Sequence, residues 1–338
     1  MAGALRACLG APKLRDKRGM ERIMQRRKLG RSGLETAPIV FGGNVLGWTA
    51  NEARSFALLD AFVASGFNCI DTADVYSRWA PGHSGGESET VIGNWLKRRG
   101  RRDDVLIATK VGSDMGDGKK GLAATYIARA VEDSLRRLQT DHIDLYQEHF
   151  DDGGAPVAET MEAFSRLVKA GKVRAIGASN ITPERLRESQ AACAANGWPR
   201  YETLQPHYNL VERAGYERDY EGLATEMGLG VIPYWSLASG YLTGKYRSEA
   251  DLGKSPRGGA AKKYLTTNGP KVLAALDEIS AGMGATPAQV ALAWLIARPS
   301  IAAPIASATS VAQWEDIAKA ATLTLSAEAM VRLDAVSA

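Results

Sequence analysis

The stretch FNCIDTADVYSRW, residues 67–79, runs from an apolar segment directly into two aspartates and a tyrosine. A buried strand usually ends in a turn, so the ionisable side chains of Asp71, Asp74 and Tyr76 at this strand end need an explanation. Similar short apolar runs recur along the chain, each followed by a longer amphipathic segment. This alternation decides the fold.

The alternation starts at Thr36 and contains eight apolar runs typical of buried strands, at 38–41, 67–71, 105–109, 143–147, 173–177, 203–206, 230–233 and 301–305. Helical patterns lie between them, near 52–65, 87–99, 124–138, 157–170, 183–195, 216–227, 270–283 and 310–320, with an extra one at 287–297. Some begin with a capping threonine before a proline, as at Thr182 and Thr286. Eight β/α units without a proline- or serine-rich linker predict an α/β fold, one closed (β/α)8 TIM barrel.

An open, doubly wound sheet is the rival fold. Such a sheet usually carries a G-x-G-x-x-G phosphate-binding turn after its first strand, whereas this chain has FGGNVLGW there and no P-loop anywhere. The glycine-rich stretch 251–269, DLGKSPRGGAAKKYLTTNG, is either a lid over the barrel mouth or a disordered loop. We favour the lid and expect long loops on the C-terminal face of the barrel.

The composition excludes several classes of function. The 338 residues are 45% hydrophobic and 24% charged, as in a water-soluble globular protein. Residues 1–23 carry the whole net charge of +4, so the remaining body has no net basic footprint for nucleic acid. There is no apolar run of about 18 residues, so no membrane-spanning helix is expected. The three cysteines have no C-x-x-C spacing, which favours the cytoplasm and argues against a bound metal.

The chain divides into a tail and one domain. We expect residues 1–23 to be a disordered basic extension. It is either a transit peptide or, as we prefer, a segment upstream of a true start at Met20 or Met24. Residues 24–338 are expected to form the single barrel domain.

Four polar residues stand where such a barrel places its chemistry, at the C-terminal ends of strands. Asp71 ends the second strand, Tyr76 follows it, Lys110 ends the third strand and His149 ends the fourth. Each could be structural when taken alone, as a helix cap, a solvated lysine or a buried histidine. Together they form the parts of one proton-transfer device.

A free tyrosine has a pKa near 10, too high for an efficient acid at neutral pH. An adjacent ammonium favours the phenolate and lowers this pKa, and a carboxylate holds the ammonium in place. Tyr76, Lys110 and Asp71 suit these roles, and His149 could orient a carbonyl by a hydrogen bond.

Six motifs, DTADVY, IATKVG, DLYQEH, IGASN, LQPHYNL and VIPYWSLASGYLTGKY, resemble the aldo-keto reductase superfamily in order and spacing, from Met24 to the C-terminus. RKLGRSGL also resembles the N-terminal hairpin that caps the bottom of that barrel. The resemblance implies an NAD(P)H-dependent carbonyl reductase that moves a hydride from nicotinamide C4 to an aldehyde or ketone. It implies Tyr76 as general acid, Lys110 and Asp71 as its tuning partners, and His149 as the residue that positions the carbonyl.

The resemblance further implies a cofactor bound in extended form, NADP(H) by family default. NAD(H) stays open because no lysine or arginine precedes Lys319 in the adenosine segment, although the lid could bring Lys254 or Arg257. Tyr234 would stack on the nicotinamide, and Trp235 would line the pyrophosphate channel or the substrate pocket. The resemblance also implies Ser179, Asn180 and Gln205 at the carboxamide, Ser239, Gly240, Leu242 and Lys245 at the pyrophosphate, and Ser307, Thr309, Ser310, Gln313 and Asp316 at the adenosine end. The remaining implied cofactor residues are Gly43, Asn44, Ser236 and Leu237.

Trp48 and Trp79 are candidates for an apolar pocket that takes a small carbonyl substrate, although either could be ordinary core. Two other functions fit a single sequence of this kind. One is a cofactor-binding regulatory module similar to channel β-subunits. The other is an aldolase that uses Lys110 as a Schiff-base nucleophile, which would require a neutral amine. The sequence does not indicate a subunit number.

Overall fold

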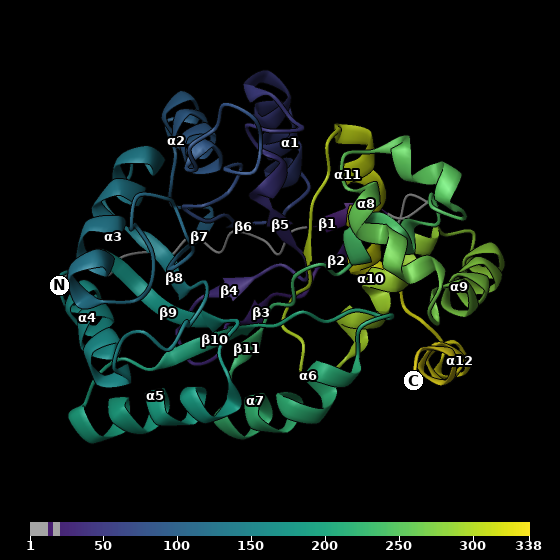
Figure 1. The fold of residues 1–338 in the computed structure, drawn as a ribbon. Helices are drawn as coiled ribbons and strands as arrows, with labels where there is room; N and C mark the ends of the chain where they lie inside the picture. Colours follow the sequence, from purple (N-terminus) through teal and green to yellow (C-terminus); the bar gives the residue numbers. More distant parts are fainter. Residues whose placement is uncertain (1–12, 16–20) are drawn as a thin grey trace, which may run out of the picture.

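The computed structural model describes residues 13–15 and 21–338. At its centre lies an eight-stranded parallel sheet with the strand order β11-β10-β9-β8-β7-β6-β5-β12 (Figure 1). Its strands are β5 (Val40–Gly42), β6 (Cys69–Asp71), β7 (Leu106–Val111), β8 (Ile143–Glu148), β9 (Val173–Ser179), β10 (Tyr201–Gln205), β11 (Gly230–Val231) and β12 (Ile305–Ala306). Each strand lies beside the next in sequence, and β12 returns to β5, as a ring requires.

The ring closes between β11 and the segment that leads into β12. Val231 and Ile301 form a parallel bridge, the Ala302 N–H donates to the Val231 carbonyl at 2.8 Å, and the Ile305 N–H donates to the Pro233 carbonyl at 2.9 Å. The predicted (β/α)8 barrel is therefore confirmed. Its last two strands are shorter than predicted, since Pro233 and Pro304 have no N–H to add to the ladder.

A hairpin closes the N-terminal end of the barrel. Strands β3 (Arg27–Lys28) and β4 (Glu35–Thr36) pair antiparallel, and Leu29 and Leu34 are buried with residues of the barrel interior. The first residue of β11, Gly230, lies so close to the hairpin that an added Cβ would come 2.8 Å from the Leu29 Cα. The predicted hairpin cap is confirmed, and it lies opposite the strand ends that carry the polar residues.

The N-terminal extension falls mostly outside the described residues. Its described part contains β1 (Lys13–Arg15) and β2 (Glu21–Ile23), which pair antiparallel. The division into a disordered extension and one domain stays a prediction.

The outer layer contains α1 (Glu52–Ala64), α2 (Glu87–Arg99), α3 (Ala124–Leu138), α4 (Val157–Lys169), α5 (Pro183–Asn196), α6 (Ala214–Asp219), α7 (Glu221–Met227), α9 (Gly269–Met283), α10 (Pro287–Ala297), α11 (Val311–Ala318) and α12 (Ala327–Ser337). The predicted helix near 216–227 is two helices, because Tyr220 leaves helical geometry (φ −124°, ψ −29°) between α6 and α7. Its hydroxyl donates to the Ile181 carbonyl at 2.7 Å. In the described chain no single helix has the length and apolar character to cross a membrane, and one bent pair, α9 with α10, meets those two criteria only jointly.

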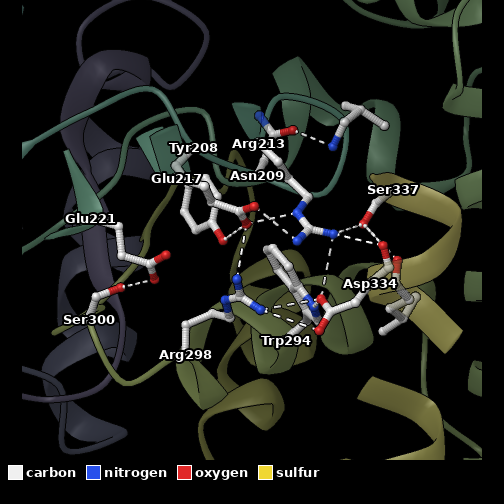
Figure 2. Close-up of polar contacts among 12 residues, drawn as sticks. Tyr208, Asn209, Arg213, Glu217, Glu221, Trp294, Arg298, Ser300, Asp334 and Ser337 are labelled. Carbon is white, nitrogen blue, oxygen red and sulfur yellow. Dashed lines mark hydrogen bonds and ion pairs between the residues drawn. The ribbon is translucent and has the colours of Figure 1, made fainter. Parts of the chain in front are cut away.

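Helix α12 was not predicted from the sequence. A polar cluster holds it against α6 and α10 (Figure 2). Arg213 donates to the Asp334 carbonyl and to the Ser337 hydroxyl, both at 2.8 Å. The Trp294 indole N–H donates to the Asp334 carboxylate at 2.9 Å. These contacts fix the C-terminal helix through long-range pairs that sequence periodicity does not reveal.

The glycine-rich stretch after β11 is folded into short helical turns. They are η3 (Glu249–Lys254), α8 (Gly258–Ala261) and η4 (Lys262–Leu265). We call residues 251–269 the lid segment, because Lys254, Arg257 and Ala260 from it reach the wall of the cavity described below.

Candidate active site

Strand register brings a carboxylate and an amine together at the C-terminal end of the barrel. Asp71 on β6 pairs with Ala108 on β7, and Lys110 lies two residues further on, so its side chain points to the same face of the sheet. The Lys110 Nζ lies 2.7 Å from the Asp71 Oδ2. Both side chains are buried, with 0% and 1% exposed.

The phenol of Tyr76 completes this group. Its oxygen lies 2.9 Å from the Lys110 Nζ and 3.3 Å from the Asp71 Oδ2. Lys110 also donates to the Thr72 carbonyl at 2.7 Å, so the loop that carries Tyr76 is itself bonded to the amine. The three side chains that the sequence singled out as one device are therefore within hydrogen-bond distance of one another.

Two glutamines hold the other oxygen of Asp71. The Gln205 Nε2 donates to the Asp71 Oδ1 at 2.9 Å, and the Gln147 Nε2 approaches the same oxygen at 3.4 Å. Gln147 was not singled out from the sequence, although its place at the end of a predicted strand was the signal that could have found it. With both oxygens engaged, the Asp71 carboxylate has one fixed orientation.

The pKa of Tyr76 is shifted in the opposite direction to the one expected from the sequence. Burial raises the pKa of Tyr76 well above its usual value of 10, and the nearby Asp71 carboxylate raises it further. Burial also lowers the pKa of Lys110 from its usual 10.5, against the opposing effect of Asp71. The expected lowering of the Tyr76 pKa is therefore wrong, because desolvation and the Asp71 carboxylate raise this pKa more than the Arg257 charge lowers it. The phenol holds its proton at neutral pH.

His149 borders the phenol. The rings of His149 and Tyr76 are 6.0 Å apart between centroids, at 73°. The Nδ1 of His149 lies 2.8 Å from the Ser113 hydroxyl, which fixes the ring orientation. Burial lowers the pKa of His149 well below 6.5, and the Lys110 charge lowers it further, so the imidazole is neutral.

A cavity of about 1620 Å³ opens over these groups. The predicted site residues that line it are Asn44, Trp48, Asp71, Tyr76, Trp79, His149, Ser179, Asn180, Gln205, Tyr234, Trp235, Ser236, Leu237, Ser239, Gly240, Lys245, Ser307, Thr309, Gln313 and Asp316. Four predicted residues lie outside its wall. One is Ser310, whose hydroxyl oxygen accepts from the Gln313 N–H at 3.3 Å at the start of α11. Lys110 is beneath the floor, Leu242 is fully buried, and an added Cβ at Gly43 would come 2.8 Å from the Asp71 carbonyl oxygen.

The Ser179 and Asn180 side chains, both predicted to hold a carboxamide, are bonded to each other, with the Asn180 amide donating to the Ser179 hydroxyl oxygen at 3.0 Å. The Ser179 hydroxyl donates to the Gln205 carbonyl at 2.9 Å, and the Asn180 amide donates to the His149 carbonyl at 2.8 Å. The Tyr234 hydroxyl donates to the Asn180 Oδ1 at 3.0 Å. Asn180 adopts φ 47° and Trp235 φ 53°, a left-handed conformation that non-glycine residues adopt only when their surroundings impose it.

The residues predicted at the adenosine end are partly committed to local structure. Gln313 accepts from the Thr309 N–H at 2.9 Å, next to the start of α11. Asp316 accepts from the Thr286 hydroxyl at 3.0 Å and from the Gln289 amide at 2.6 Å. Asp316 thereby joins α11 to the start of α10, whose first residues also line the cavity.

Phe150 and Arg257 are among the residues of the cavity wall that were not assigned to it from the sequence. Phe150 follows His149 and is 49% exposed. Arg257 of the lid segment was named only as a possible cation, and it donates to the Asn44 Oδ1 at 2.9 Å. Among the described residues Arg257 forms no ion pair with a carboxylate, so its charge faces the cavity without a counter-ion. In residues 13–15 and 21–338 no group of three or more metal-binding side chains gathers.

The family model described as Aldo/keto reductase family matches residues 38–338. The chain belongs to the aldo/keto reductase family.

Full-length relatives agree with this assignment. This aldo/keto reductase is 35% identical over 319 residues to the uncharacterized oxidoreductase YrpG of Bacillus subtilis, covering 92% of this chain and 95% of the relative. It is 31% identical over 342 residues to Protein tas of Escherichia coli, covering 93% and 97%. It is also 30% identical over 309 residues to a probable voltage-gated potassium channel subunit beta of Arabidopsis thaliana, covering 88% and 91%. The family resemblance found from the motifs is confirmed, and this aldo/keto reductase is an oxidoreductase by family.

Proposed function

We propose that this protein is an NADP(H)-dependent carbonyl reductase in which Tyr76 is the general acid. The observation that carries the proposal is the 2.9 Å contact between the Tyr76 oxygen and the Lys110 Nζ, beside the cavity and next to the neutral His149. None of these side chains can provide a hydride, so a redox cofactor is required.

A bound nicotinamide would supply the hydride to the carbonyl carbon. Tyr76 gives its proton to the carbonyl oxygen, which yields an alcohol and leaves a phenolate. The Lys110 ammonium, held by Asp71, stabilises that phenolate and restricts its position. His149 keeps the substrate oxygen near the phenol by a hydrogen bond. The phenol is protonated at neutral pH, so its proton is available for this transfer.

The cavity residues fit an extended dinucleotide. The volume of the cavity exceeds that of an ordinary single-ligand pocket. Amide and hydroxyl groups of Ser179, Asn180 and Gln205 lie near the floor of the cavity. Lys245, Lys254 and Arg257 bring positive charge to its wall, which suits phosphates. We propose Arg257 as a phosphate ligand, because it lies partly buried at the cavity wall without a carboxylate partner among the described residues. These cations favour NADP(H) over NAD(H).

A titration tests the proposal. The protein is titrated with NADPH and with NADH while its tryptophan fluorescence is followed, and turnover is then measured on aldehydes and ketones. Tyr76→Phe should bind NADPH within about twofold of the parent and lose a factor of about 10²–10⁴ in turnover. The assignment of the acid fails if the phenylalanine variant turns over as fast as the parent protein.

The alternative functions give different results in the same experiment. Tight NADPH binding with no reduction of any carbonyl would favour a regulatory module, and the Arabidopsis relative is named as a probable potassium channel subunit beta. The aldolase gains no support, because the Lys110 amine donates to Asp71, Thr72 and Tyr76 and lies outside the cavity wall. We place the protein in the cytoplasm as part of the proposal.

A further inference from the structure

One carboxylate closes a turn that lies behind the cavity wall. The turn, residues 209–212, follows β10, and the N–H of its last residue donates to the carbonyl of its first at 3.1 Å. Tyr208 precedes the turn, and its hydroxyl donates to the Glu217 Oε1 at 2.7 Å. Arg213 follows the turn and donates to both oxygens of the same carboxylate, at 2.8 and 3.0 Å. Glu217 of α6 therefore joins the two ends of the turn.

Neighbouring helices hold this carboxylate in place (Figure 2). Arg298, directly after α10, donates to the Glu217 Oε1 at 3.0 Å, and Arg213 is itself bonded to Ser337 of α12. Burial raises the pKa of Glu217, but the hydrogen bonds from Arg213 and Tyr208 outweigh burial and lower this pKa below its usual value. The carboxylate is therefore charged at neutral pH. We call Tyr208, Arg213, Glu217 and Arg298 the Glu217 clamp.

The turn that the clamp closes carries Asn209, whose side chain supports the cavity wall. Asn209 is fully buried, and its amide nitrogen donates to the Trp235 carbonyl at 3.0 Å. Trp235 has the left-handed backbone conformation described above, which non-glycine residues retain only when their surroundings impose it. Tyr234 and Trp235 both line the cavity. A strained part of the wall is thus held by a side chain whose own position depends on the turn.

We propose that Glu217 is a positioning residue for the cofactor, which acts by holding Asn209 on the Trp235 carbonyl. Glu217 does not line the cavity, so its effect passes through the turn. A wall that is already ordered loses less conformational freedom when a ligand binds, and the ligand therefore binds more tightly. The inference rests on the proposed function in one respect, that the nicotinamide lies against Tyr234.

The first test removes one hydroxyl from the clamp. Tyr208→Phe keeps the ring, which packs 4.6 Å from Tyr216 and 5.5 Å from Trp294 between centroids. The dissociation constant for NADPH should rise about three- to tenfold, because part of one hydrogen bond to a charged group is lost from the bound state. The kcat at saturating NADPH should stay within about twofold. Tyr146→Phe is the matched control and should change neither value, because the buried Tyr146 hydroxyl has no hydrogen bond among the described residues.

Two variants of the carboxylate test the same clamp. Glu217→Leu removes both acceptor oxygens and should weaken NADPH binding at least as much as Tyr208→Phe. Glu217→Gln keeps one acceptor oxygen and should bind NADPH more tightly than Glu217→Leu does. The double variant of Tyr208→Phe with Glu217→Leu should bind no more weakly than Glu217→Leu alone, since both changes remove the same bond. If Glu217→Leu does not fold, Tyr208→Phe still decides the question.

A measurement without cofactor separates this inference from the proposed function. The seven tryptophans are replaced by 5-fluorotryptophan, and the fluorine resonance that is missing in Trp235→Phe is assigned to Trp235. This resonance should shift or broaden in Tyr208→Phe and stay in place in Tyr146→Phe. That result supports the clamp even if the parent binds no NADPH, which would overturn the proposed function alone. A Trp235 resonance that behaves alike in both variants, or equal NADPH affinity of Tyr208→Phe and the parent, would overturn the inference and leave the proposed function intact.

Discussion

The imidazole of His207 stacks on the ring of Tyr234, with centroids 5.3 Å apart and an interplanar angle of 13°. The Asn209 Oδ1 accepts from the Val211 N–H at 2.9 Å, which orients its amide nitrogen toward His207 Nε2 at 3.3 Å. Nε2 therefore acts as an acceptor, and the proton of the neutral ring lies on Nδ1. Burial lowers the pKa of His207, Lys263 adds to this effect and Glu212 opposes it.

This stack predicts a positioning role for His207 behind Tyr234, the ring we propose to stack on the nicotinamide. His207→Ala should weaken NADPH binding by about three- to tenfold, because one aromatic pair contributes about 0.5–1.5 kcal/mol. His207→Phe keeps a ring at this position and should stay within about twofold. Dissociation constants from fluorescence titration check both values.

The His207→Phe variant shows whether His207 acts on Tyr234 through ring stacking or through its hydrogen bond with Asn209. Equal weakening in His207→Phe and His207→Ala would mean that the bond from Asn209, not the ring, holds Tyr234. Equal NADPH affinity of the parent, His207→Ala and His207→Phe would show that His207 does not contribute to cofactor binding.

The centre of the candidate site was predictable because a rule of fold geometry applies to it. Once eight β/α units were recognised, the ends of the strands had to meet at one face, and Asp71, Tyr76 and Lys110 met there. The register of β6 with β7 came from the structure, which pairs Asp71 with Ala108, and the period of two along β7 then places Lys110 on the same face as Ala108.

The rest depended on contacts between distant segments. Arg257 meets Asn44 across 213 positions, and Arg213 holds Ser337 across 124 positions. No local pattern encodes such pairs. The direction of the Tyr76 pKa was missed for a related reason, because desolvation depends on how completely the folded chain encloses the phenol.

The buried ion pair of Lys110 and Asp71 predicts a strong dependence of stability on both partners. Lys110→Met leaves the Asp71 carboxylate buried without its cation, so the free energy of unfolding should fall by about 3–5 kcal/mol. Adding Asp71→Asn removes the unpaired charge and should restore more than half of that loss. Urea denaturation at pH 7 measures both changes. Simple additivity of the two single losses in the double variant would show that the pair is not coupled.

Asp74 lies in the same loop as Tyr76, and we expect its buried carboxyl to make the protein less stable as the pH rises. Its carboxyl is buried, and neither oxygen makes a well-formed hydrogen bond among the described residues. Burial, together with the charge of Glu89, raises its pKa to about 8. In the unfolded chain it ionises near pH 3.9. Between these values only the folded state keeps the proton, so stability falls as the pH rises toward 8.

Asp74→Asn removes this dependence. Relative to the parent, the variant should gain about 3–4 kcal/mol of unfolding free energy between pH 5 and pH 8. Urea denaturation at both pH values provides the measurement. Asp103→Asn, at a carboxylate whose side chain is 87% exposed, serves as the control and should show no such gain. An equal offset of Asp74→Asn at both pH values would mean that Asp74 is already ionised in the folded protein.

For the buried His149 we expect the opposite effect of pH, a loss of stability as the pH falls. Its pKa in the folded protein lies well below 6.5 because of burial and the Lys110 charge, whereas the unfolded chain titrates near 6.5. As the pH falls below 6.5, the unfolded state binds a proton that the folded state does not bind. The free energy of unfolding therefore decreases until the pH reaches the pKa of His149 in the folded protein. In His149→Gln, which keeps a polar side chain near Ser113, the loss between pH 7 and pH 5 should be smaller. The imidazole carbon resonances of His149 should also remain constant from pH 6 to pH 8, and a titration midpoint near 6.5 would contradict a neutral, buried ring.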